Sequence, residues 1–175
     1  MLNPIQQLQI RQLEVSDAPA YRAFRLRALR EHADSFTSSF EEENARPLLD
    51  TEKRLQAVAD GKLWGAYVAG DMAGMVGLSL EMRIKCRHKG LLVSMYVAPQ
   101  YTNHGLGRSL VETVLADARA TGLELVTLTV TDSNQAAIAL YKKCGFISFG
   151  TEPDAIRVNG ASFGKTHMYL SLKNN

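Results

Sequence analysis

The stretch Leu91–Arg119 constrains the fold most, because it joins a strand pattern to a helix pattern through two glycines. It reads LLVSMYVAPQYTNHGLGRSLVETVLADAR. The apolar run Leu91–Val97 has the length and β-branched content of a buried strand, and Pro99 ends it. After Gly105-Leu106-Gly107, apolar residues recur at helical spacing. The sequence therefore predicts a strand, a glycine-containing turn and the N-terminus of a helix.

This turn has the features of a phosphate site. A helix N-terminus offers unpaired N–H donors and partial positive charge, and glycine lets a phosphate approach the backbone. Two common phosphate motifs are excluded by spacing. A P-loop needs Gly-Lys-Ser/Thr, but Gly107 is followed by Arg108. A dinucleotide motif needs a third small residue where Leu110 stands.

Two motifs resemble those of the GNAT N-acetyltransferase superfamily. The first is the acyl-CoA motif, Val-x-Pro followed by Gln/Arg-x-x-Gly-x-Gly/Ala. Here it reads Val97-Ala98-Pro99 and Thr102–Gly107, with Thr102 where Gln or Arg is usual and Asn103 where many members have glycine. The second, Asn-x-x-Ala-x-x-Leu-Tyr-x-x-x-Gly-Phe, corresponds to Asn134–Phe146.

The resemblance implies an α/β (α+β) fold with a mixed, mostly antiparallel twisted sheet flanked by helices. A strand, helix and strand in that order imply that the runs Leu91–Val97 and Leu125–Val130 pair in parallel through a right-handed crossover. In the family this parallel pair splays apart at its C-terminal end. We expect one N-acetyltransferase domain over residues 1–175, with a core of about residues 8–173.

The remaining segments carry weaker patterns. Asp34–Pro47 reads as irregular, and Glu152–Gly164 reads as a loop because of Pro153 and two further glycines. Ser16 or Asp17 is predicted to cap the first helix. The other expected strands are 8–14, 62–69, 72–82, 146–150 and 166–172, and the other expected helices begin near residue 17, at 50–60 and at 135–144.

The implied activity is transfer of an acetyl group from acetyl-CoA, as co-substrate, to a primary amine of a small molecule or protein by direct attack in a ternary complex. The acceptor stays open among small molecules, polyamines, antibiotics and protein amines. The alternative is a domain that binds acyl-CoA without catalysis and acts as a sensor. Thr102 and Asn103 favour the sensor, whereas Tyr141 and Asn134 favour the enzyme.

The resemblance also assigns site residues. Tyr141 resembles the tyrosine that protonates the leaving thiolate, although an aromatic core anchor is the alternative. Asn134 would hydrogen-bond the cofactor, cap the next helix, or do both. Glu81 is the first candidate for the base that accepts the amine proton. The expected acetyl-CoA-binding residues are Met95, Tyr96, Val97, Thr102, Asn103, His104, Gly105, Leu106, Gly107, Arg108, Asn134 and Tyr141.

Several charged clusters have two interpretations each. The arginines of residues 22–30 form a solvated face or contact an acidic substrate. Glu41-Glu42-Glu43 are an exposed helix start or recognise a cationic amine. The turn Arg83–Lys89 is a charged hairpin end or contacts a phosphate or the acceptor. His104 is interpreted as a phosphate-loop side chain, and Cys144 as a small buried hydrophobic residue.

Composition limits the remaining function classes. Hydrophobic residues make up 46% and charged residues 22%, with a net charge of +2, so neither a nucleic-acid partner nor a membrane partner is expected. No His/Cys group has metal-ligand spacing, so no metal is expected. Cys86 and Cys144, without a secretory or membrane-spanning segment, predict reduced thiols and a cytoplasmic location. A homodimer is left open.

Overall fold

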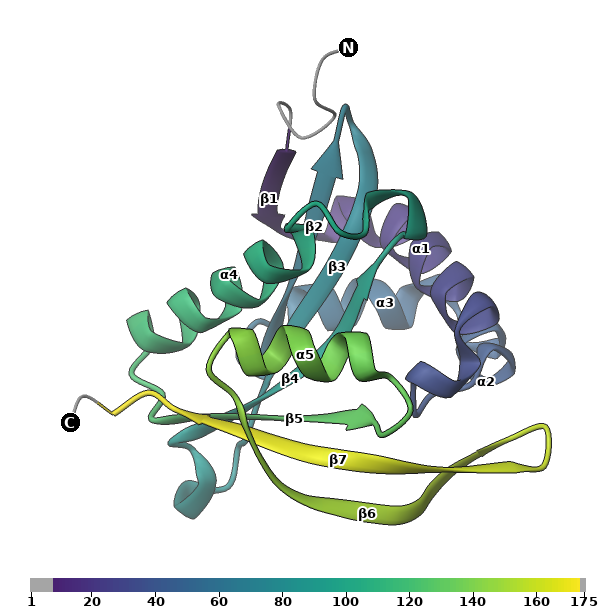
Figure 1. Ribbon diagram of the computed structural model, residues 1–175. Coiled ribbons are helices and arrows are strands. Elements are labelled where there is room, and N and C mark those ends of the chain that lie inside the picture. Colours follow the sequence, from purple (N-terminus) through teal and green to yellow (C-terminus); the bar gives the residue numbers. More distant parts are fainter. Residues whose placement is uncertain (1–7, 174–175) are drawn as a thin grey trace.

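One seven-stranded sheet organises the protein (Figure 1). The computed structural model describes residues 8–173. The strand order is β1-β2-β3-β4-β5-β7-β6. The strands are β1 (Leu8–Gln12), β2 (Gly61–Val68), β3 (Asp71–Leu80), β4 (Lys89–Val97), β5 (Leu125–Thr131), β6 (Ile147–Val158) and β7 (Ala161–Ser171). The helices are α1 (Ala18–Glu31), α2 (Phe40–Ala45), α3 (Leu48–Gln56), α4 (Leu106–Ala120) and α5 (Gln135–Lys143).

The sheet is antiparallel except where β4 meets β5. This parallel pair is short, because only Lys89, Gly90 and Leu91 of β4 have register partners on β5. Beyond Leu91 the two strands separate, as the sequence predicted. On the other side of β4, the pairing with β3 shifts register between Met75 and Gly77. Ser94, at this irregularity, has a φ of 56°, and such bulges bend a strand away from its neighbour.

Side-chain alternation along the strands builds two cores, one on each face of the sheet. The neighbours Met75 and Val76 on β3 show the pattern, since each is fully buried in a different core. Val76 packs with α4 and α5, and Met75 packs with α1. Figure 1 shows α4 and α5 on one face and α1, α2 and α3 on the other. The central strands are therefore held from both sides.

Two segments that were predicted to be irregular are regular in the structure, so both predictions are wrong. Residues 40–45 form α2, which Ser39 begins with a capping box that includes Glu42. The expected loop 152–164 is instead the long β6–β7 hairpin, turned at Asn159-Gly160 where both φ angles are positive. Pro153 is accommodated because β6 is an edge strand whose register is irregular between Glu152 and Ile156.

Two hydrogen bonds hold the connection between α1 and α2 against strands β5 and β7. Thr131 Oγ1, at the end of β5, donates a hydrogen bond of 2.5 Å to the Asp34 carbonyl. The buried Lys165 of β7 donates to Thr37 Oγ1. Because β5 and β7 carry these two donors, the residues after α1 lie beside the splayed end of β5.

No helix within residues 8–173 is long and apolar enough to cross a membrane.

Asp17 stands at the N-cap of α1, but its side chain makes no cap hydrogen bond to the helix. The carboxylate instead accepts two hydrogen bonds of 2.7 Å from the Arg11 guanidinium and one of 2.8 Å from the Glu14 N–H. This pairing joins β1 to the start of α1. The bond to Arg11 holds the pKa of Asp17 at about 2, well below its usual range.

We predict that Asp17→Asn destabilises the fold by about 1–2 kcal/mol at neutral pH. The folded pKa lies below the unfolded value of about 3.9, so the pair stabilises the protein above about pH 4 and this contribution is lost as the pH falls toward 2. Urea unfolding of both proteins should therefore show a difference at pH 7 that shrinks in acid. Asp154→Asn breaks an exposed ion pair with Arg157 and serves as the control. A pH-independent difference would contradict the prediction.

Candidate active site

A groove of about 1200 Å³ opens where β4 and β5 separate. Its walls come from both strands, from the turn before α4, from α5 and from the α1–α3 side. Ten of the predicted residues line it: Met95, Tyr96, Val97, Thr102, Asn103, Gly105, Gly107, Arg108, Asn134 and Tyr141. The fold thus brings together residues from two motifs that lie about 40 residues apart in the chain.

Three predicted site residues do not line the groove. Leu106 is buried in the core beneath α4, and His104 is exposed on the turn. Glu81 follows the end of β3, next to the register pair Leu80 and Gly90. It therefore lies near the closed end of the parallel pair, where β4 and β5 are still hydrogen-bonded.

The turn before α4 is shaped to present backbone donors. Asn103 and Gly105 both have left-handed φ angles, 63° and 80°, and Gly105 is the N-cap of α4 without a side-chain cap. Thr102, where the family has Gln or Arg, donates its hydroxyl to the Pro99 carbonyl at 2.8 Å and so braces the turn. Arg108 adds a cation at the groove wall. This end suits a phosphate group.

Gly107 allows close packing at the same place. A Cβ atom there would lie 3.1 Å from Leu140 Cδ2 and 3.4 Å from Met95 Cε. Both of those side chains line the groove. Any larger residue at position 107 would therefore push into the groove wall.

The middle of the groove exposes the edge of β4. From Leu92 onward, β4 has no ladder partner on its β5 side within the described residues. Backbone groups left unpaired in this way can bind an extended chain as an added strand. A pantetheine arm, which carries amide groups, has the chemistry to pair there. This edge and the turn before α4 thus offer donors to two different kinds of group, amides and phosphates.

Tyr141 serves the core and reaches the groove. Its ring is 5% exposed and packs edge-on against Phe146, with ring centroids 5.9 Å apart. The residue also lines the groove. Burial raises the pKa of Tyr141 well above its usual value. The phenol is protonated at neutral pH, as an unperturbed tyrosine also is.

Asn134 caps α5, because its Oδ1 accepts a hydrogen bond of 3.1 Å from the Ala137 N–H. It also lines the groove. Capping and ligand contact are therefore compatible at this position, since the side-chain NH₂ group is not used by the cap. Cys144, at the other end of α5, is a free thiol whose pKa is raised by burial, which suits a packing role.

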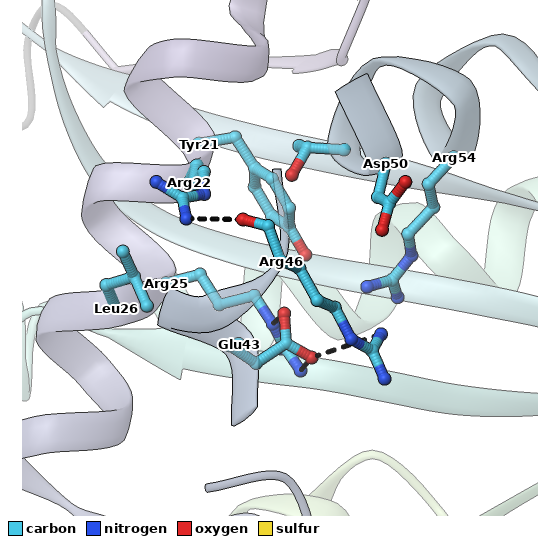
Figure 2. Close-up of a pocket in the computed structure, with 9 residues that line it drawn as sticks. Tyr21, Arg22, Arg25, Leu26, Glu43, Arg46, Asp50 and Arg54 are labelled. Carbon is cyan, nitrogen blue, oxygen red and sulfur yellow. Dashed lines mark hydrogen bonds and ion pairs between the residues drawn. The ribbon is translucent and has the colours of Figure 1, made fainter. Parts of the chain in front are cut away.

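The end of the groove opposite the turn is lined by Arg25, Arg46 and Arg54, and for Arg25 one of the two interpretations was a solvated face. Arg25 of α1 is only 8% exposed, so that interpretation is wrong for this residue. Its guanidinium lies 3.2 Å from Ser94 Oγ and 3.4 Å from the Glu43 carboxylate. Arg54 Nη2 lies 3.4 Å from the same Ser94 oxygen. Figure 2 shows Arg25, Arg46 and Arg54 converging near Glu43.

The acidic run has other uses in the structure. Glu42 caps α2, and hydrogen bonds from Ser39 lower its pKa. Glu43 is paired with Arg25 and, at 3.8 Å, with Arg46. Glu41 is exposed. The turn 83–89 also lies apart, since none of its residues lines the groove. No group of three metal-ligating side chains occurs within residues 8–173.

Comparisons with known proteins agree with this geometry. The model of the Acetyltransferase (GNAT) family matches residues 26–146. The L-amino acid N-acyltransferase MnaT of Escherichia coli (strain K12) is 31% identical over 83 residues, which are 45% of this chain and 46% of that protein. The chain thus matches about half the length of this curated relative.

Two solved structures share the fold. An acetyltransferase of the GNAT family from Streptococcus pneumoniae has a TM-score of 0.87 at 28% identity, covering 95% of this chain and 99% of that one. A Salmonella typhimurium protein solved with acetyl-CoA has a TM-score of 0.83 at 19% identity, covering 96% and 95%.

We predict that Gly107→Val weakens binding of acetyl-CoA roughly tenfold or more, since overpacking costs about 1–3 kcal/mol. Thermal protection by acetyl-CoA measures this, because a ligand of the native state raises the melting temperature. Bare pantetheine should protect the wild type much less than acetyl-CoA does.

Ser109→Val is the matched control, because it adds the same side chain to α4 at a position that does not line the groove. Equal protection of Gly107→Val and Ser109→Val would show that Gly107 only starts the helix.

Proposed function

Because the chain belongs to the GNAT acetyltransferase family, we propose that it transfers an acetyl group from acetyl-CoA to a primary amine. Both substrates are bound at once, and the amine attacks the thioester directly. One observation carries the proposal: the unpaired edge of β4 and Tyr141 line one groove, whose arginine-lined wall is separate from the turn proposed to bind phosphate. We assign this activity to the whole chain as one domain.

Each end of the groove has its own task. Backbone N–H groups of residues 103–108 hold the pyrophosphate of CoA, and the β4 backbone at residues 95–97 pairs with its pantetheine arm. The acceptor enters from the α1–α3 side. Holding both reactants in one groove removes most of the entropy cost of their encounter.

Acetyl transfer within this complex then needs only modest catalysis by protein groups. The neutral amine nitrogen forms a bond to the thioester carbon, whose oxygen is stabilised by a backbone N–H near Val97. The nitrogen loses its proton, the carbon–sulfur bond breaks, and the thiolate takes a proton from the Tyr141 hydroxyl. Tyr141 regains its proton from solvent. The Tyr141 phenol is protonated at neutral pH and so carries the proton to be donated, and the burial that raises its pKa makes it a weaker acid than a free tyrosine.

The fold constrains the base that takes the amine proton less tightly than it constrains Tyr141. Glu81 stays a proposal, and its place outside the groove lining argues against direct contact. Glu43 is the carboxylate that lines the groove among the described residues, and it is already paired with Arg25. If Glu81 is the base, Glu81→Gln should lower turnover most at low pH. If a water relays the proton to solvent instead, turnover should be nearly unchanged at every pH.

The sensor alternative predicts binding without turnover. Thiol release from acetyl-CoA, measured with a panel of small amines, polyamines, aminoglycosides and peptides, separates the two. Amine-dependent release supports the enzyme. Tight binding of acetyl-CoA with no release across the panel supports the sensor.

We predict that Tyr141→Phe lowers turnover by about ten- to a thousand-fold, somewhat less than the usual loss of a general acid, because a thiolate is a tolerable leaving group without help. The ring and its packing on Phe146 remain, so the melting temperature and acetyl-CoA affinity should change little. Rates with a better thiol leaving group should recover part of the loss.

Tyr169→Phe is the control, since Tyr169 lies on β7 and does not line the groove. A Tyr141→Phe protein that melts much lower but turns over normally when folded would make Tyr141 a core anchor alone.

A further inference from the structure

We infer that the acetyl acceptor carries a carboxylate, and that a pocket between α1 and the α2–α3 segment binds it. That the bound molecule is an acetyl acceptor depends on the proposed function. The carboxylate site itself is argued from the pocket alone. This pocket has a volume of about 40 Å³ and is lined by Tyr21, Arg22, Arg25, Leu26, Glu43, Arg46, Asp50, Thr51 and Arg54 (Figure 2).

Tyr21 provides the first argument. Its side chain is 1% exposed, and its hydroxyl has no hydrogen-bond partner among the described residues. A buried donor left unpaired is destabilising, so native proteins rarely keep one without a use. The ring belongs to the pocket lining and points toward it (Figure 2). A bound acceptor atom would satisfy this hydroxyl.

The charges around the pocket provide the second argument. Four arginines line it against two carboxylates, Glu43 and Asp50. Arg22 is used internally, because it donates to the Asn44 and Arg46 carbonyls at 3.0 and 2.7 Å. Arg46 reaches Glu43 only at 3.8 Å, and Arg54 has a single long contact of 3.4 Å with Ser94. These two guanidinium groups therefore have donors to spare for an anion.

Arg25 adds an incompletely satisfied donor inside the pocket. Its Nε is buried and makes no hydrogen bond, although it lies 3.4 Å from Glu43 Oε2. The Glu43 carboxylate is thus the partner of both Arg25 and Arg46, at 3.4 and 3.8 Å. A second carboxylate, brought by a ligand, would complete the set in the paired geometry that guanidinium groups favour.

The pocket is placed to serve the reaction. Arg25, Arg46, Arg54 and Glu43 line both this pocket and the large groove. Arg25 and Arg54 both contact Ser94 Oγ. Ser94 directly precedes Met95–Val97, the proposed binding edge for pantetheine. A carboxylate held by these arginines would therefore leave its amine beside the reacting thioester.

The pocket size favours a carboxylate over larger anions. A cavity must offer about 10–15 Å³ for each water it holds, so this pocket has room for a group of about three non-hydrogen atoms. A carboxylate has that size, is planar, and matches the edge of a guanidinium. A phosphate or sulfonate carries four or five such atoms and is tetrahedral.

The first experiment compares matched acceptors by thiol release from acetyl-CoA. A panel of L-amino acids is run beside their carboxamides, which keep the amine and shape but lose the charge. We expect kcat/KM to be about tenfold or more higher for the acids. β-Alanine, taurine and 2-aminoethylphosphonate then compare three anions on one chain length. Equal rates for acids and amides, or a preference for the sulfonate or phosphonate, overturns the inference.

The second experiment uses variants. Arg54→Gln and Tyr21→Phe should each reduce the acid-to-amide ratio of kcat/KM by about tenfold, mainly through a higher KM for the acid. Arg83→Gln removes one charge from the exposed turn 83–89 and should keep the wild-type ratio. An unchanged ratio in both pocket variants contradicts the inference. Tyr21→Phe keeps the ring in the core, so a folding defect is not expected.

A binding measurement separates this inference from the proposed function. Glutarate and glutaramide are tested as thermal protectants of wild type, Arg54→Gln and Arg83→Gln at constant ionic strength with CoA present. Protection by glutarate that Arg54→Gln loses and Arg83→Gln keeps supports the carboxylate site even if no amine is acetylated. Acetylation of amines without selective protection or acid preference supports the enzyme and overturns the site.

Discussion

The separation of β4 from β5 after three paired residues is the constraint on which the rest of the site depends. A strand in the middle of a sheet normally satisfies its backbone on both sides. Here β4 is satisfied on the β3 side and, beyond Leu91, open on the other. The bulge around Ser94 bends β4 at this point. An enclosed edge of backbone donors and acceptors is thereby kept for an extended ligand.

Packing on both faces keeps that opening from collapsing. On the α4 side, Gly74 lets β3 approach the helix so closely that a Cβ atom would lie 2.8 Å from Leu110 Cδ1. On the α1 side, the Tyr96 ring packs against Phe24, with centroids 5.2 Å apart, and against His32 and Phe36. The β4 strand is therefore fixed by its two cores, and it does not need β5 along its full length.

The sequence was most informative where structure is local. Strand, turn and helix at residues 91–119 follow from periodicity and glycine placement, and the resemblance added the splay. The hairpin beyond Pro153 was missed because its Asn159-Gly160 signal was outweighed by proline and glycine content. The arginine end of the groove was missed for a different reason. Arg25 contacts Ser38, Glu43 and Ser94, which are 13 to 69 residues away in the chain, and the periodicity of its own helix does not reveal such neighbours.

The two halves of the groove have different origins along the chain. The CoA half is built within residues 89–146, from two strands and the helices that directly follow them. The acceptor half comes mostly from residues 21–54, which contribute no strand to the sheet. Under the proposed function, substitutions in α2 and α3 would alter which amine is accepted while leaving the sheet register intact. The proposed acceptor wall could then change its substrate range without any change in the strands proposed to bind CoA.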